Sequence, residues 1–217
     1  MNRQGRPWLI VGAVVILVLF GGVPTIQRKA LAEPLSHGFT YTSDDTVKTG
    51  DLMNTIQFLS LITNTGSEPD TYAVVRTENP PTPEDWWMTF CVGGICWDSL
   101  TTVAQTYLEP GNSDMVLLDI IPRSIGKGSV TITVESMDDP ELPNKSLNFT
   151  VIQRGDATGD GKVDVGDVIY LVNYLFRSGT PPFPLDAGDA NCDGKVDVGD
   201  AIYLVNYLFK AGPIPSC

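Results

Sequence analysis

Two acidic loops of nearly the same sequence are the segments whose residue types and spacing point most directly to chemistry. Residues 156–167 and 189–200 are related by a shift of 33 positions, and both have aspartate at positions 1, 5, 9 and 12. Glycine stands at position 6 of both loops. A calcium loop has ligands at positions 1, 3, 5, 7, 9 and 12 and needs this glycine for a sharp turn. The spacing therefore predicts two calcium ions, one in each loop.

The predicted ligands occupy equivalent positions in the two loops, with side-chain oxygens at five positions and a backbone carbonyl at position 7. They are Asp156, Thr158, Asp160, Lys162, Asp164 and Asp167 in the first loop, and Asp189, Asn191, Asp193, Lys195, Asp197 and Asp200 in the second. Position 12 is aspartate rather than the usual glutamate, and no helical pattern precedes either loop. A solvated acidic turn is the alternative for one such loop, but two equally spaced copies favour metal binding.

Each loop runs directly into a segment that is apolar nearly all round, residues 168–177 and 201–210. A surface helix normally has one apolar stripe. These two predicted helices therefore need each other and a further partner, either the neighbouring domain or another protein.

Residues 155–210 resemble a type I dockerin, on the strength of the repeated G-D-x-N-x-D-G-x-V-D-x-x-D loop and the L-x-x-Y-L helix that follows it. The L-x-x-Y-L motif occurs at 171–175 and 204–208. The resemblance implies calcium-dependent folding and docking to a cohesin-like domain, usually in extracellular assemblies that degrade polysaccharide. It places partner recognition at loop positions 10 and 11 and on the following helix: Val165, Gly166, Val172 and Asn173, and Val198, Gly199, Val205 and Asn206. Because the two sets are identical, either helix could face the partner.

The N-terminus predicts export. An apolar run from Trp8 to Val23 follows two arginines, and Ala30-Leu31-Ala32 supplies a signal peptidase site. The run has 16 residues, fewer than the roughly 20 that span a bilayer. We expect a signal peptide at residues 1–32, no stable membrane span after its cleavage, and a secreted or cell-surface protein. A retained anchor is the alternative, because Arg28 and Lys29 lie between the apolar run and the cleavage site.

Charge agrees with this location. Four of the 14 basic residues and none of the 26 acidic ones lie in the leader, which leaves a formal net charge of −16 on the mature chain. Nucleic acid and anionic membranes are poor partners for such a surface, and we expect no nucleic-acid binding. Eight of the acidic residues are loop aspartates that repel one another until calcium binds, so we expect the module to loosen without calcium.

Four cysteines in an exported chain suggest two disulfides. Cys91 and Cys96 flank a two-glycine turn that would bring them together across a hairpin, which leaves Cys192 to pair with Cys217. Free thiols or metal ligands are the alternative, although the chain has no CxxC pair and a single histidine, His37.

Residues 37–153 read as short alternating strands between Gly, Pro, Asn and Asp turns. About seven strands are expected: 55–63, 72–76, 87–91, 103–108, 115–121, 130–134 and 147–151. The predicted fold is thus mainly β, with an immunoglobulin-like sandwich at 37–153 and the small α module of two loop-helix repeats at 154–217. The segments 64–72 and 108–113, together with Trp87, resemble immunoglobulin-like modules beside the catalytic domains of secreted glycosidases. That resemblance implies a spacer or binding role.

Three aromatic residues and four carboxylates suggest alternatives to a purely structural sandwich. We expect Trp87 in the core, and Trp86 on the other side of the strand, where it could form a sugar-stacking platform with Trp97. Nothing in the spacing of Glu84, Asp85, Asp98 and Asp119 selects the facing pair that glycoside hydrolysis needs. The sequence favours a non-catalytic adaptor. The alternatives are a carbohydrate-binding accessory protein and a small glycoside hydrolase component.

Overall fold

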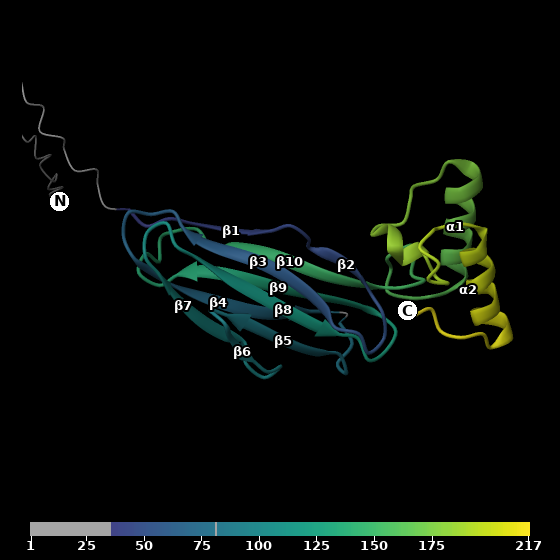
Figure 1. The fold of residues 1–217 in the computed structure, drawn as a ribbon, viewed down its shortest axis with the longest axis horizontal. Coiled ribbons are helices and arrows are strands. Elements are labelled where there is room, and N and C mark those ends of the chain that lie inside the picture. Colours follow the sequence, from purple (N-terminus) through teal and green to yellow (C-terminus); the bar gives the residue numbers. More distant parts are fainter. Residues whose placement is uncertain (1–35, 81) are drawn as a thin grey trace, which may run out of the picture. The chain divides into compact units, whose positions relative to one another are not determined.

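Ten strands and two α-helices make up the part of the chain that the computed structural model describes, residues 36–80 and 82–217 (Figure 1). The predicted signal peptide lies outside these residues. The strands are β1 Phe39–Ser43, β2 Val47–Gly50, β3 Ile56–Asn64, β4 Asp70–Asn79, β5 Trp87–Val92, β6 Ile95–Trp97, β7 Val103–Leu108, β8 Ser113–Ile121, β9 Lys127–Ser136 and β10 Lys145–Gln153.

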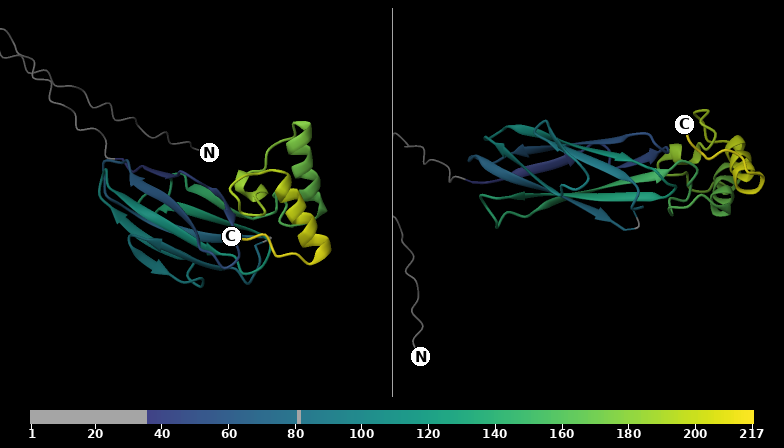
Figure 2. Two further views of the ribbon diagram at one scale, coloured as in Figure 1. Left: turned by 45° about the vertical axis from the view of Figure 1, so that its right-hand side comes forward. Right: turned by 90° about the horizontal axis from the view of Figure 1, so that it is seen from below.

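The strands form two five-stranded sheets in the orders β1-β3-β8-β5-β6 and β2-β10-β9-β4-β7. All pairs are antiparallel except β2 with β10. Side chains alternate between the interior and the surface along most of the strands, as in β9, where Val130, Ile132 and Val134 are fully buried. In β10, the last five residues are all buried. The second view of Figure 2 shows the strands in two layers. The predicted immunoglobulin-like sandwich, mainly β, is confirmed.

Three strands were missed in the sequence: β1, β2 and β6, which have 5, 4 and 3 residues. All three lie at sheet edges, where a strand has only one neighbour. Such short segments contain too few alternations to be distinguished from loops by pattern alone.

The C-terminal module contains α1 Val165–Arg177, a short 3₁₀ helix η1 Leu185–Gly188, and α2 Val198–Lys210. Both α-helices begin three residues earlier than the apolar pattern suggested. Asp164 and Asp197 cap them, each paired in a capping box with the aspartate at N3. Both helices end in a left-handed residue, Ser178 or Ala211. None of the helices in the described residues is long and apolar enough to cross a bilayer.

A second hydrophobic core holds the module together. Leu171 of α1 and Leu204 of α2 are fully buried at its centre, with Ala157, Ala190 and Ala201 around them. Val163 and Val196 pack against this core from the loops. Neither valine belongs to a strand in the described residues.

The structure contains both predicted disulfides. Cys91 and Cys96 face each other across the β5–β6 hairpin, and Cys192 of the second loop is joined to Cys217 at the C-terminus. All four cysteines are therefore engaged, and the alternatives of free thiols or metal ligands are wrong.

Candidate calcium loops and docking surface

In the first loop, three of the predicted ligands converge. The hydroxyl of Thr158 lies 3.2 Å from Asp156 Oδ1 and 3.0 Å from Asp167 Oδ1. Both carboxylates are buried, with exposed fractions of 0% and 1%. Positions 1, 3 and 12 thus present oxygen atoms toward one another.

The carboxylate of Asp156 also organises the turn of the loop. Its Oδ1 accepts N–H groups from Gly159 at 2.7 Å and Asp160 at 3.1 Å, and its Oδ2 accepts the Gly161 N–H at 2.8 Å. Gly161 has φ of +93°, a left-handed conformation that glycine adopts without strain. Glycine at position 6 therefore has the role predicted for it.

The second loop repeats this arrangement. Asp189 accepts the N–H groups of Asp193 and Gly194, both at 3.1 Å. Asp200 accepts the N–H of Asn191 at 3.2 Å and that of Asp197 at 2.8 Å. Asp189 and Asp200 are buried, like their counterparts in the first loop. Two segments 33 residues apart have therefore folded into the same loop.

The aspartates at positions 5 and 9 accept nearby backbone N–H groups, and in the second loop Asp193 Oδ2 also accepts the side-chain N–H of Asn191, at position 3, at 3.2 Å. Asp160 and Asp193 accept the N–H groups of Lys162 and Lys195, two residues further along, and Asp164 and Asp197 cap the helices. Among the described residues, no three Asp, Glu, His or Cys side chains lie close enough together to form a metal centre by themselves. In the first loop, a calcium ion would be held by the converging atoms of positions 1, 3 and 12, with positions 5 and 9 as the remaining predicted side-chain ligands.

Electrostatics favour a cation at these loops. Burial raises the pKa of Asp156, Asp167 and Asp200, and the neighbouring Asp156 charge raises the pKa of Asp167 further. In the described part of the chain, no lysine, arginine or histidine forms an ion pair with any of these three. A divalent cation would supply the missing positive charge, so the donor set fits calcium.

Beyond the loops, both helices expose an apolar stripe. The stripe is defined by residues spaced i, i+4, i+7 and i+11, which lie on one side of a helix. On α1 it consists of Val165, Ile169, Val172 and Phe176, with exposed fractions of 45%, 56%, 38% and 67%. On α2 the equivalent residues are Val198, Ile202, Val205 and Phe209, of which Val205 is half-buried.

The stripes include four of the residues predicted for partner binding, Val165, Val172, Val198 and Val205, and add four that were missed. Gly166 is exposed, whereas Asn173, Gly199 and Asn206 are half-buried. The carbonyls of the two asparagines accept N–H groups of the C-terminal turns that follow the helices. The missed residues, Ile169, Phe176, Ile202 and Phe209, could have been found from the helical period of the apolar positions alone.

The structure reverses the roles predicted for two adjacent tryptophans. Trp86 is buried against Gly128, and its indole N–H donates to the Ser124 carbonyl at 2.9 Å. Trp87 is 44% exposed. Met88 and Phe90 are buried, so strand alternation places Trp86 inward and Trp87 outward. The predicted platform of Trp86 and Trp97 is therefore wrong, because Trp86 is buried.

Trp87 borders an open cleft of about 590 Å³. The cleft is lined by Glu84, Asp85, Trp86, Trp87, Asp98, Ser99, Leu100 and Arg123. The Arg123 guanidinium lies 5.2 Å from the centre of the Trp87 ring. Three of the four carboxylates considered for glycoside hydrolysis, Glu84, Asp85 and Asp98, thus line one cleft. Asp119 does not line it, and its carboxylate accepts a hydrogen bond from Gln57 at 2.9 Å.

Comparison with known proteins assigns the C-terminal module. Residues 154–209 match the family model of the dockerin type I domain. The chain therefore carries a dockerin type I module after its sandwich, as the loop and helix motifs predicted. No curated protein sequence matches the chain.

Solved structures resemble the chain only weakly. The N-terminal domain of PorA has a TM-score of 0.43 and 13% identity, covering 54% of this chain and 98% of that domain. A conjugative transposon lipoprotein from Bacteroides eggerthii has a TM-score of 0.37 and 12% identity, covering 52% and 95%. A family 123 glycoside hydrolase from Clostridium perfringens has a TM-score of 0.37 and 11% identity, covering 54% of this chain and 27% of the enzyme. Similarity of this degree carries no functional argument.

Proposed function

We propose that this protein is a secreted, non-catalytic adaptor that docks through its C-terminal module to a cohesin-like domain, in a polysaccharide-degrading or cell-surface assembly. The match of residues 154–209 to the dockerin type I domain supports cohesin docking. The observation that carries the proposal is the pair of equivalent exposed apolar stripes on α1 and α2. Apolar side chains repeated on an exposed face mark a protein interaction surface.

Calcium is the second part of this proposal. Two ions, one bound by each loop, would offset the charge of the buried aspartates and hold the N-terminal ends of α1 and α2 in place. Because Asp164 and Asp197 are both predicted ligands and helix caps, the conformation of each loop is linked directly to the start of its helix. Docking should therefore require calcium.

Capture by an immobilised cohesin domain tests both parts. The wild-type protein should bind with calcium and be released by excess chelator. Asp160→Ala combined with Asp193→Ala should eliminate capture, because each loop loses one carboxylate ligand, whereas Glu84→Ala in the sandwich should leave capture unchanged. Retention of the double loop variant at wild-type affinity would contradict calcium-dependent docking.

The two stripes can be tested separately from calcium. Ile169→Asp on α1 and Ile202→Asp on α2 place a charge at equivalent positions that are both 56% exposed, so neither should disturb folding. If either helix can face the partner, each single variant should keep binding and the double variant should lose it. Loss in only one single variant would show that one helix alone makes the contact.

A second candidate function, saccharide binding, is favoured by the cleft at Trp87. A partly exposed indole, with carboxylates nearby and the Arg123 guanidinium over its ring, offers both stacking and hydrogen bonds to hydroxyl groups. Trp87→Ala should abolish retention on an insoluble polysaccharide without loss of stability. The control is Trp97→Ala, outside the cleft lining; equal retention by wild type and Trp87→Ala would remove this candidate.

A further inference from the structure

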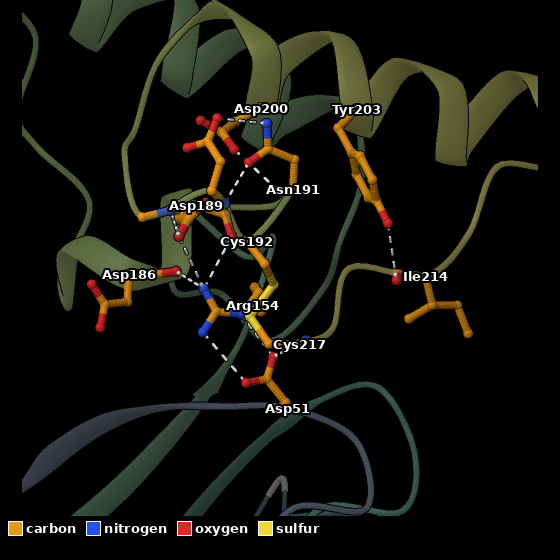
Figure 3. Close-up of a disulfide and its surroundings, with 12 residues drawn as sticks. Asp51, Arg154, Asp186, Asp189, Asn191, Cys192, Asp200, Tyr203, Ile214 and Cys217 are labelled. Atoms are coloured by element: carbon orange, nitrogen blue, oxygen red, sulfur yellow. Dashed lines mark hydrogen bonds and ion pairs between the residues drawn. A yellow bond between two sulfur atoms is a disulfide. The ribbon is translucent and has the colours of Figure 1, made fainter.

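Arg154 joins the sandwich to the dockerin module at the point where the chain passes from β10 into the first loop. Its Nε donates to Asp51 Oδ1 at 2.7 Å and its Nη2 to Asp51 Oδ2 at 3.3 Å, a two-pronged ion pair between buried side chains (Figure 3). Asp51 belongs to the sandwich and directly follows β2. The Arg154 guanidinium is thus held in place by a residue of the sandwich.

The other prong of the same guanidinium reaches the second calcium loop. Nη1 donates to the carbonyl oxygens of Asp186 at 3.1 Å and Asp189 at 3.0 Å, and lies 3.6 Å from Asp189 Oδ2 (Figure 3). Asp189 occupies position 1 of the second loop. One side chain therefore connects a sandwich carboxylate to a predicted calcium ligand.

Asp51 has a second connection to the same loop. Its Oδ1 accepts the backbone N–H of Cys217 at 3.1 Å, and Cys217 is joined by a disulfide to Cys192, at position 4 of the second loop. Both routes from Asp51 thus end within four residues of each other, at Asp189 and Cys192 (Figure 3).

The first loop lacks this arrangement. The residue of the second repeat that is equivalent to Arg154 is Ala187, which cannot form an ion pair. Accordingly, Asp156, at position 1 of the first loop, forms no ion pair within residues 36–80 and 82–217. The sandwich contacts the first loop through Lys127, whose Nζ donates to the Gly159 carbonyl at 2.9 Å. The two loops are alike in sequence but differ in how the sandwich holds them.

We propose that Asp51 is a positioning residue for the second calcium site. By neutralising and orienting Arg154, it holds the guanidinium in hydrogen bonds to the backbone carbonyls of Asp186 and Asp189. The contact with the Asp189 carboxylate is thereby limited to the 3.6 Å approach of Nη1 to Oδ2, which leaves the carboxylate available to calcium. Without Asp51, the buried guanidinium loses its partner and competes with calcium for that carboxylate. This inference rests on the proposed calcium binding. The difference that it predicts between the two loops goes beyond that proposal.

The test is calcium titration of the full-length mature protein and its Asp51→Asn variant by calorimetry, with amide NMR signals of Gly161 and Gly194 reporting on each loop. Asparagine keeps an acceptor for the Cys217 N–H, so the substitution removes mainly the charge. We expect calcium affinity at the second loop to fall about 10- to 100-fold, the usual effect of losing a partner that orients a metal ligand. Affinity at the first loop should stay unchanged.

Two further variants complete the test. Lys127→Met removes the contact to the first loop and should leave the second loop at wild-type affinity. Asp51→Asn combined with Arg154→Ala removes both charges and should recover part of the lost affinity, because the competing guanidinium is gone.

The outcomes separate this inference from the proposed function. If the wild-type protein binds calcium at both loops and Asp51→Asn leaves the calcium affinity of the second loop unchanged, the inference alone is overturned. An equal loss of calcium affinity at both loops would also overturn it. Absence of calcium uptake in the wild-type protein would overturn calcium binding itself, and the inference with it.

Discussion

The glycines at position 6 of the two loops have the same conformation but different surroundings. Gly161 and Gly194 have φ of +93° and +83°. A Cβ atom on Gly161 would lie 3.2 Å from Lys127 Cβ, whereas one on Gly194 would meet nothing within 4 Å. The sandwich therefore limits the size of the residue at position 6 in the first loop only.

Alanine at the two positions should separate backbone strain from crowding. Gly194→Ala should lower the free energy of unfolding by about 1–2 kcal/mol, the cost of a left-handed residue with a Cβ atom. Gly161→Ala should cost more, because Lys127 must also move. Urea unfolding of both variants in saturating calcium measures the difference, and equal losses would show that Lys127 yields freely.

The local contacts within the two loops were the most predictable feature of the candidate site. The spacing of aspartates and glycines determined the loop geometry, because each contact spans only a few residues along the chain. The contact of Arg154 with Asp51 spans 103 positions and could not be predicted from the sequence. Trp86 and Trp87 were assigned to the wrong sides, although the alternation of Met88 and Phe90 contained the answer.

At the scale of elements, local hydrogen bonds fix the limits of both helices. Asp164 and Asp197 start them three residues before the apolar pattern, and left-handed residues end them. The long central strands were predictable from their alternation. The edge strands β1, β2 and β6 were not, because they are too short to show a clear alternation and are defined by their pairing with a neighbouring strand.

The two disulfides should contribute unequally to the elements that they join. They close segments with sequence separations of 5 for Cys91–Cys96 and 25 for Cys192–Cys217. Chain entropy predicts a stabilisation of about 2 kcal/mol for the shorter segment and about 3.5 kcal/mol for the longer one. Paired Cys→Ser variants, compared by denaturant unfolding, should show the larger loss for Cys192 and Cys217. A larger loss for the hairpin pair would contradict the entropic estimate.

At the scale of the whole molecule, the described residues contain two separate hydrophobic cores. The sandwich core comprises large side chains such as Phe58, Tyr72 and Phe90, all essentially inaccessible to solvent. The core of the module is built around two leucines and three alanines. So small a core buries little apolar surface, and we therefore expect the stability of the module, rather than that of the sandwich, to depend on calcium.

Chelation should therefore unfold one part of the mature protein and leave the other folded. Excess chelator leaves the buried Asp156, Asp167 and Asp200 without a counter-ion, so the helical far-UV signal of residues 155–210 should be lost. The near-UV signal of Trp86 should persist, because its ring belongs to the sandwich core, which is separate from the core of the module. Circular dichroism in both regions during one chelator titration measures this. Helicity that survives excess chelator would show that the small core and the disulfide suffice, and simultaneous loss of both signals would show that the sandwich depends on the module.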